Sequence, residues 1–159
     1  MTSRGSTDPK DRIFGALVYI IPLLDALQFG KFLINQFPPL ALIYLPLQPL
    51  INIYYGFPFA SFIIFLLLFF AIVRNEKISH FIRFNAMQCI LIGILLALFG
   101  LIVQTIFPGL GVNLLTETLF NVAFLGALAA CGYSIIQSVM GRYAEIPTIS
   151  EAAYSQVRW

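Results

Sequence analysis

The chain has 159 residues, of which 60% are hydrophobic and only 10% are charged, so an ordinary soluble enzyme, with about 25% charged residues, is nearly excluded. A chain this small needs a charged shell to keep its apolar surface from associating in water, and its solvent must therefore be lipid. The net charge is only +2 and the nine Lys and Arg are scattered, which argues against nucleic acid as a partner.

Long charge-free stretches divide the chain into membrane-spanning segments. A helix needs about 20 apolar residues to cross the hydrocarbon core. The sequence therefore predicts an all-α integral membrane protein, a bundle of four transmembrane helices with an interfacial proline-rich connector between the first and second. The expected spans cover about 13–34, 57–73, 84–103 and 118–140. The expected domains are a polar N-terminal tail and helix cap over 1–12, a membrane domain over 13–143 and a polar C-terminal tail over 144–159.

The first span contains a proline and an early charge. Residues 13–24 are apolar, but Pro22 lies among them and Asp25 follows. We expect a span kinked at Pro22, because proline removes one intrahelical hydrogen bond. Asp8 followed by Pro9 is typical of a helix start.

The same stretch has the form of a signal peptide, which is the alternative interpretation. Lys10 and Arg12 would be its basic region, and residues 13–24 its apolar core. Because no small-x-small cleavage site follows, we favour an uncleaved span.

The segment 38–58 is apolar, yet five prolines prevent a regular spanning helix. It has too few charges to be a solvated loop. We expect short helical pieces at the membrane interface, with Tyr44, Tyr54 and Tyr55 at headgroup depth. A re-entrant segment is the alternative.

The distribution of Lys and Arg predicts the topology. Four spans place both termini on one face of the membrane, together with the loop between the second and third spans. That face carries Arg4, Lys10, Arg12, Arg74, Lys77, Arg83, Arg142 and Arg158. The other face carries Lys31 alone. Because positive loops stay cytoplasmic, both termini are expected in the cytoplasm, or in the stroma for a plastid membrane.

Conventional catalytic signatures are absent, so we expect no enzyme, no catalytic residue, no cofactor and no metal site. His80 is the single histidine, and Glu76 four residues earlier is weak support for a metal site. The simpler interpretation is an interfacial polar residue. Cys89 and Cys131 lie in separate spans and are expected to pack as small apolar side chains.

Two stripes of polar residues face the outer leaflet and are costly enough in lipid to suggest a function. Helical spacing places Asp25, Gln28, Asn35 and Gln36 on one face, and Asn113, Glu117 and Asn121 on another. Facing each other, they would form a candidate polar path of Asp25, Gln28, Glu117 and Asn121. The simpler interpretation, which we favour, is that Asp25 and Glu117 mark helix ends, with Lys31 available as a partner.

The start of the third span carries a candidate structural motif made of Arg74, Asn75, Arg83, Asn85 and Gln88. Asn85 and Gln88 are neighbours at i, i+3, so an interhelical amide contact is expected. Arg83 points to nearly the opposite side and lies close enough to the inner interface to reach lipid phosphates.

The fourth span contains small residues at intervals of four, at Gly126, Ala130, Ser134 and Ser138. An adjacent row contains Ala123, Ala127 and Cys131. Small residues let helix backbones approach closely in lipid. We therefore expect Gly126, Ala130 and Ser134 to form a helix-packing face, against this bundle or against a partner.

Three segments of the chain form a recognisable set: DRIFGALVY at 11–19, FPFASF at 57–62 and, most specifically, VRNEKISHFIRFNAMQ at 73–88. They resemble the twenty-kilodalton subunit family of the translocon at the inner chloroplast envelope (Tic) and its cyanobacterial relatives. The resemblance covers about residues 11–143. It implies a four-helix membrane protein of plastid protein import, proposed as a channel component or a core scaffold, and it assigns no catalytic residue.

Plant members of that family carry a long N-terminal transit sequence, whereas this chain starts with a short polar lead. We therefore expect a cyanobacterial or plastid-encoded member, in a cyanobacterial plasma or thylakoid membrane or in the plastid inner envelope.

Two hypotheses of function follow. The first is a non-enzymatic subunit of a membrane complex for protein translocation or membrane-protein assembly. Its expected partners are the lipid bilayer, other translocon or assembly subunits, translocating polypeptides and a second copy of itself. The alternative is a small autonomous transporter or channel for an ion or solute.

Overall fold

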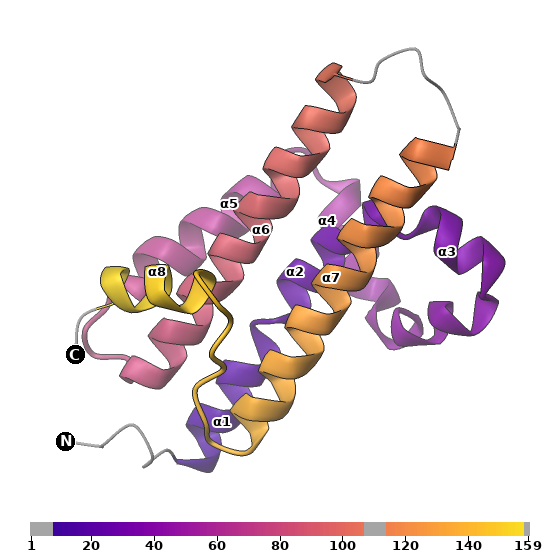
Figure 1. The fold of residues 1–159 in the computed structure, drawn as a ribbon. Coiled ribbons are helices and arrows are strands. Elements are labelled where there is room, and N and C mark those ends of the chain that lie inside the picture. The colour runs from indigo at the N-terminus through magenta and orange to yellow at the C-terminus, as the bar shows by residue number, and fades with distance from the viewer. Residues whose placement is uncertain (1–7, 107–113, 158–159) are drawn as a thin grey trace.

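The computed structural model describes residues 8–106 and 114–157, and every regular element within these ranges is helical (Figure 1). The longest helices are α6 (His80–Ile106) and α7 (Leu114–Val139). The shorter α1 (Pro9–Leu17) and α2 (Ile20–Ala26) pack against both of them. The predicted all-α class is confirmed.

The first span runs through α1, α2 and the short 3-10 helix η1 (Leu27–Phe29). The helix is interrupted at Val18 and Tyr19, one turn before Pro22. Pro22 has no N–H to donate to the Val18 carbonyl, which instead accepts a hydrogen bond from the Ile21 N–H at 3.2 Å. Asp8 occupies the N-cap position, but its side chain makes no capping bond in the described part of the chain.

The same span ends at Phe29, whereas the sequence suggested that it continues to about residue 34. Gly30 packs so closely on α7 that a Cβ atom there would lie 2.7 Å from Cε1 of Phe124. After Gly30, the helix α3 (Lys31–Gln36) leaves the bundle (Figure 1). The span thus ends at a residue that has to be small because it contacts a distant part of the chain.

The connector consists of short helices, as its prolines suggested. They are η2 (Pro38–Ile43), η3 (Leu45–Leu47) and α4 (Gln48–Gly56). Its tyrosines do not simply point outward to headgroups. The Tyr44 hydroxyl donates to the Leu23 carbonyl at 2.9 Å and the Tyr55 hydroxyl donates to the Leu24 carbonyl. The last four carbonyl groups of an α-helix lack the usual N–H donor four residues later in the chain. In α2, two of these carbonyl groups, those of Leu23 and Leu24, accept hydrogen bonds from the two tyrosines instead.

The second predicted span is a bent pair. The helix α5 (Ala60–Leu66) continues into the π-helix η4 (Leu67–Val73), and this arm is too short to cross a membrane alone. The arm is long and apolar enough to cross a membrane only when it is counted together with Leu45–Gly56. The two parts are bent by 99° relative to each other. Phe59 at the bend adopts a left-handed conformation with φ of 60°.

The predicted number of four spanning helices is therefore not confirmed. Within residues 8–106 and 114–157, three helices are long and apolar enough to cross a membrane, and a fourth is reached only if the bent pair counts as one span.

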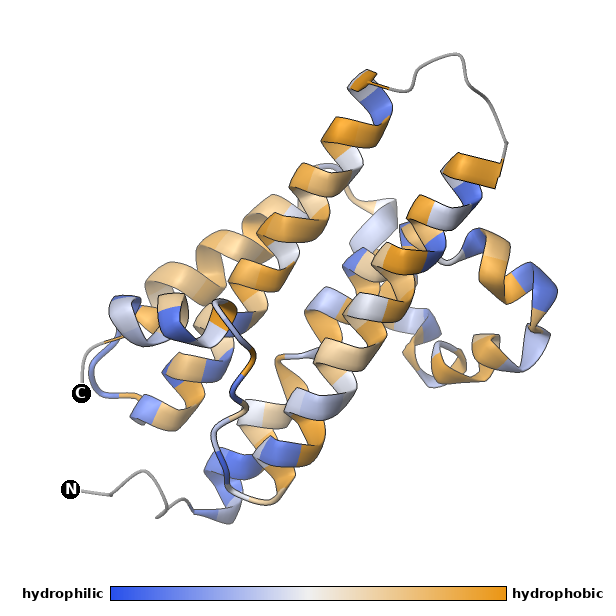
Figure 2. Cartoon of the chain, viewed as in Figure 1, coloured by the Kyte–Doolittle hydropathy of each residue, from blue (hydrophilic) through white to orange (hydrophobic). Residues whose placement is uncertain are grey.

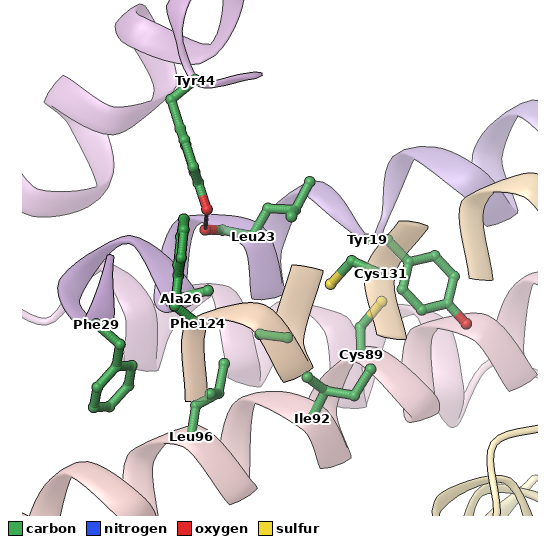
Figure 3. Packing of buried hydrophobic residues seen from close by; sticks show 11 residues of the cluster. Tyr19, Leu23, Ala26, Phe29, Tyr44, Cys89, Ile92, Leu96, Phe124 and Cys131 are labelled. Atoms are coloured by element: carbon green, nitrogen blue, oxygen red, sulfur yellow. Dashed lines mark hydrogen bonds between the residues drawn. The ribbon is translucent and has the colours of Figure 1, made fainter. Parts of the chain in front are cut away.

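The core lies where α2, α6 and α7 meet (Figure 3). Cys89 and Cys131 are free thiols inside this core, and they pack among apolar side chains. Many large apolar side chains of α5, α6 and α7 remain exposed on the outside of the bundle. Figure 2 shows hydrophilic residues at the beginnings of α1 and α6 and along α8 (Ile149–Gln156), near the two termini. The exposed apolar faces fit a lipid solvent.

Candidate functional site

A fully buried polar cluster joins the main helices. It consists of Tyr19, Asn85, Gln88, Ser134 and Ser138, and we call it the Asn85–Gln88 cluster. Oδ1 of Asn85 accepts hydrogen bonds from the Tyr19 hydroxyl at 2.6 Å and from the Ser138 hydroxyl at 3.2 Å. Nε2 of Gln88 donates to the Tyr19 hydroxyl at 3.0 Å and to the Ala144 carbonyl at 3.1 Å. Nδ2 of Asn85 donates to the Phe81 carbonyl of its own helix.

The helical spacing explains why these residues meet. Asn85 and Gln88 lie three residues apart on α6, and Ser134 and Ser138 lie four apart on α7, so each pair occupies one face of its helix. Tyr19 stands at the break between α1 and α2. The cluster thus connects the first span, α6, α7 and the segment after α7. Its neutral amide and hydroxyl groups can hold these helices together.

Asp25 lies in a second polar site, next to the connector bonds of Leu23 and Leu24. Its Oδ1 accepts a hydrogen bond from the Tyr54 hydroxyl of α4. Its Oδ2 faces α6, where a Cβ atom on Gly93 would lie 3.1 Å away. A larger residue at position 93 would therefore press on this carboxylate oxygen.

A cavity of about 240 Å³ opens beside Asp25, between α2, α5 and α6. Asp25, Tyr54 and Ser61 give it a polar end, and its other walls are mostly apolar. A cavity of this kind can hold a water or a polar group of a guest molecule at the carboxylate, while apolar atoms occupy the rest.

The remaining members of the predicted polar path lie elsewhere. Glu117 accepts a hydrogen bond from Nε2 of Gln36 at 2.6 Å, which ties α3 to α7. Nε2 of Gln28 donates to the Asp25 backbone carbonyl at 3.1 Å. Oδ1 of Asn121 is buried and has no hydrogen-bond partner in the described part of the chain. Asn113 falls outside the described residues. The structure joins Asp25 to α4 and Glu117 to α3, and no hydrogen bond connects the two carboxylates within the described ranges.

Lys31 was the suggested partner of these carboxylates. Its Nζ lies instead over the rings of Phe32 and Phe120, at 5.0 and 5.4 Å from the ring centres. A cation over aromatic faces is a favourable arrangement that needs no carboxylate.

The motif before α6 forms a tight turn. Oδ1 of Asn75 accepts the Lys77 N–H at 3.0 Å, which is the hydrogen bond of an Asx turn. The Arg74 guanidinium lies 5.8 Å from the centre of the Phe69 ring. Arg83 is buried, with 4% of its surface exposed, and its Nε donates to the Ile78 carbonyl at 3.0 Å.

His80 contacts the C-terminal segment. Its Nδ1 and the Tyr143 hydroxyl are 2.7 Å apart, and its ring stacks on that of Tyr154 in α8. Among the described residues, no three His, Cys, Asp or Glu side chains gather as metal ligands. His80 therefore lies where the segment after α7 returns to the start of α6.

The inner face of α7 differs from the row of small residues singled out in the sequence. Gly126 is exposed, and a Cβ atom there would meet nothing within 4 Å. Ala130 is half-buried and Ser134 is fully buried. A strict interval of four residues advances by about 40° per step around a helix, so such a row winds away from a contact face. The buried positions on α7 instead alternate intervals of three and four, at Phe124, Ala127, Cys131, Ser134 and Ser138.

Sequence reasoning missed Tyr19 and Tyr54, the residues that complete the two polar sites. Both lie in apolar surroundings of the sequence, where they were counted as part of a span or as interfacial aromatics. The available signal was chemical: a tyrosine hydroxyl within an apolar helix needs a hydrogen-bond partner.

Comparisons with known proteins show the family to which the chain belongs. Residues 7–153 match the family described as "Chloroplast import apparatus Tic20-like". The chain is 66% identical over 160 residues to the "Tic20 family protein" of Synechocystis sp., over 100% of both chains. It is 37% identical to "Protein TIC 20-v, chloroplastic" of Arabidopsis thaliana, over 96% of this chain and 73% of that protein. It is 34% identical to the "Tic20 family protein Ycf60" of Gracilaria tenuistipitata var. liui, over 92% of this chain and 75% of that protein.

Proposed function

Because the chain belongs to the Tic20 family, we propose that it is a non-enzymatic, multi-pass membrane subunit acting in protein translocation across a membrane or in membrane-protein assembly. The observation that carries this proposal is the family match, which extends from before α1 into α8. The Asn85–Gln88 cluster is compatible with a membrane subunit, because its hydrogen bonds join the first span to α6.

Isolation of the full chain from its native membrane in mild detergent tests this function. The expected result is a stable complex with larger membrane proteins, from which a translocating polypeptide can be crosslinked to the chain. Recovery of the chain alone, as an oligomer that conducts a solute or ion when reconstituted into liposomes, would contradict the subunit role.

The transporter alternative is favoured by one observation, the cavity beside Asp25. A carboxylate beside a cavity between membrane helices is the kind of residue that marks a polar path. We treat Asp25 as the member of the proposed path with the strongest support, together with Tyr54, whose hydroxyl contacts it.

Replacement of Asp25 by asparagine is expected to lower activity about tenfold, because the amide keeps the shape but loses a charge-assisted interaction. Activity is measured as complementation of a strain that lacks the chain, with insertion and assembly followed in the same membranes. Glu117→Gln is the matched control and is expected to be tolerated, since Glu117 bonds to Gln36 at an exposed position. Full activity of Asp25→Asn would remove Asp25 from the path.

We also propose that both termini face the cytoplasm or stroma. The start of α6 contacts Tyr143 and Tyr154 of the C-terminal segment, and Gly15 of α1 packs against Phe81 of α6. The starts of α1 and α6 and the end of α7 thus share one end of the bundle. The positive-inside rule assigns that end to the cytoplasm or stroma.

Labelling with a membrane-impermeant thiol reagent tests the topology. Cysteines introduced at Lys10 and Glu151 are expected to react only after the membrane is opened, and one at Asn113 is expected to react from outside. Cys89 and Cys131 are buried and provide an unreactive background. Labelling at Lys10 or Glu151 in sealed membranes would contradict the proposed orientation.

A further inference from the structure

A polar cavity of about 280 Å³ lies at the start of α6, away from both polar sites described above. The end of η4, the turn before α6 and the end of α8 enclose it. Its lining residues are Val73, Arg74, Glu76, Arg83, Ser155 and Gln156. Two guanidinium groups and one carboxylate line it, so its charge is positive.

Arg83 is the most unusual member of this lining. It is buried, with 4% of its surface exposed, and in the described part of the chain its hydrogen bond runs from Nε to the Ile78 carbonyl. No carboxylate lies within ion-pair distance of it among the described residues. A buried cation without a partner is costly. An anion in the adjacent cavity would remove that cost, because the outer N–H groups of the guanidinium would bind it.

The location favours an anion held at the membrane surface. The cavity lies at the N-terminal end of α6, where the partial positive charge of a 27-residue helix attracts anions. It is also the point where an apolar spanning helix begins, which is the depth of lipid headgroups. Arginine binds phosphate through two parallel N–H groups, which suits this residue type.

We propose that this cavity binds one phosphate group, that of an anionic phospholipid, with Arg83 as its principal ligand and Arg74 at its rim. Glu76 opposes binding from the same lining and keeps the site from attracting every anion. The site is independent of the proposed translocation function, because it uses neither the Asn85–Gln88 cluster nor the Asp25 cavity.

Native mass spectrometry of the full chain in detergent, with equimolar phosphatidylglycerol and phosphatidylcholine, tests this proposal. The wild-type chain is expected to retain phosphatidylglycerol preferentially. Arg83→Gln should lower that preference about tenfold and Arg74→Gln about threefold. Glu76→Gln should raise it about threefold, which is the opposite direction. Arg142→Gln removes the same charge at an exposed position outside the cavity and should change nothing.

The test remains decisive even if one variant fails to fold. If Arg83→Gln does not fold, the exposed pair Arg74→Gln and Glu76→Gln still gives opposite shifts if the proposal holds. Equal retention of both lipids by the wild-type chain, or equal effects of Arg74→Gln and Arg142→Gln, would overturn it. Displacement of phosphatidylglycerol by millimolar inorganic phosphate would show that the site takes phosphate from solution, and would overturn the assignment to lipid.

Discussion

Replacement of Asn85 by leucine is expected to lower the free energy of unfolding by about 2–3 kcal/mol. Leucine has nearly the same size, so the loss comes from hydrogen bonding: the buried hydroxyls of Tyr19 and Ser138 lose their common acceptor. A buried donor without a partner costs about 1–3 kcal/mol, and single bonds between membrane helices average about 0.6 kcal/mol. Denaturation in mixed micelles measures the change.

The matched control for this substitution is Gln104→Leu, which makes a similar exchange at an exposed position of the same helix. It is expected to leave stability unchanged or to raise it. Tyr19→Phe removes the hydroxyl that donates to Asn85 and accepts from Gln88. It should still cost less than Asn85→Leu, because Ser138 keeps its bond to Asn85 and Gln88 keeps its bond to the Ala144 carbonyl. A loss for Gln104→Leu as large as that for Asn85→Leu would contradict the role of the Asn85–Gln88 cluster.

The second large effect is expected for Gly15→Leu. A Cβ atom at Gly15 would lie 2.8 Å from Cε1 of Phe81 and 2.9 Å from Nδ2 of Asn85, so any side chain there separates α1 from α6. Overpacking costs about 1–3 kcal/mol or more, which exceeds the gain of about 1 kcal/mol from replacing glycine within a helix. We expect a lower unfolding midpoint and disturbed packing around Asn85.

Gly126→Leu is the matched comparison, because a Cβ atom there meets nothing within 4 Å. The isolated chain should keep its stability. The same variant tested in the native membrane separates two roles of the small residues on α7. Loss of the native complex without loss of stability would identify Gly126 as a contact with a partner, whereas equal instability of Gly15→Leu and Gly126→Leu would contradict the packing described here.

The long helices could be predicted from the sequence because length and apolarity alone define them. The expected spans at 84–103 and 118–140 correspond to α6 and α7, the latter ending at Val139. The end of the first span at Gly30 could not be predicted, since Gly30 packs against Phe124, far along the chain. The path of α4 also involves a distant contact, because Tyr55 of this helix binds the Leu24 carbonyl near the end of α2.

Some features of the polar sites could likewise be predicted from the sequence, and others could not. The shared face of Asn85 and Gln88 follows from their spacing, so it could be predicted without a structure. Their partner Tyr19 could not, because the break one turn before Pro22 turns it inward. The pairing of Asp25 with Tyr54 rather than with Lys31 could not be predicted either, because it depends on the path of the connector. Its prolines show where helices are interrupted, but not in which direction the chain continues.

The short arm formed by α5 and η4 has a consequence for the surrounding lipid. The two seven-residue helices together measure about 21 Å at about 1.5 Å per residue, whereas the hydrocarbon core is about 30 Å thick. One way in which a bilayer accommodates a short apolar segment is by thinning beside it. Residues of α5 also line the cavity at Asp25, so thinning beside the arm would bring headgroups and water closer to that carboxylate. A polar segment approaching from this flank would then have less hydrocarbon to cross than one approaching along the 27-residue helix α6.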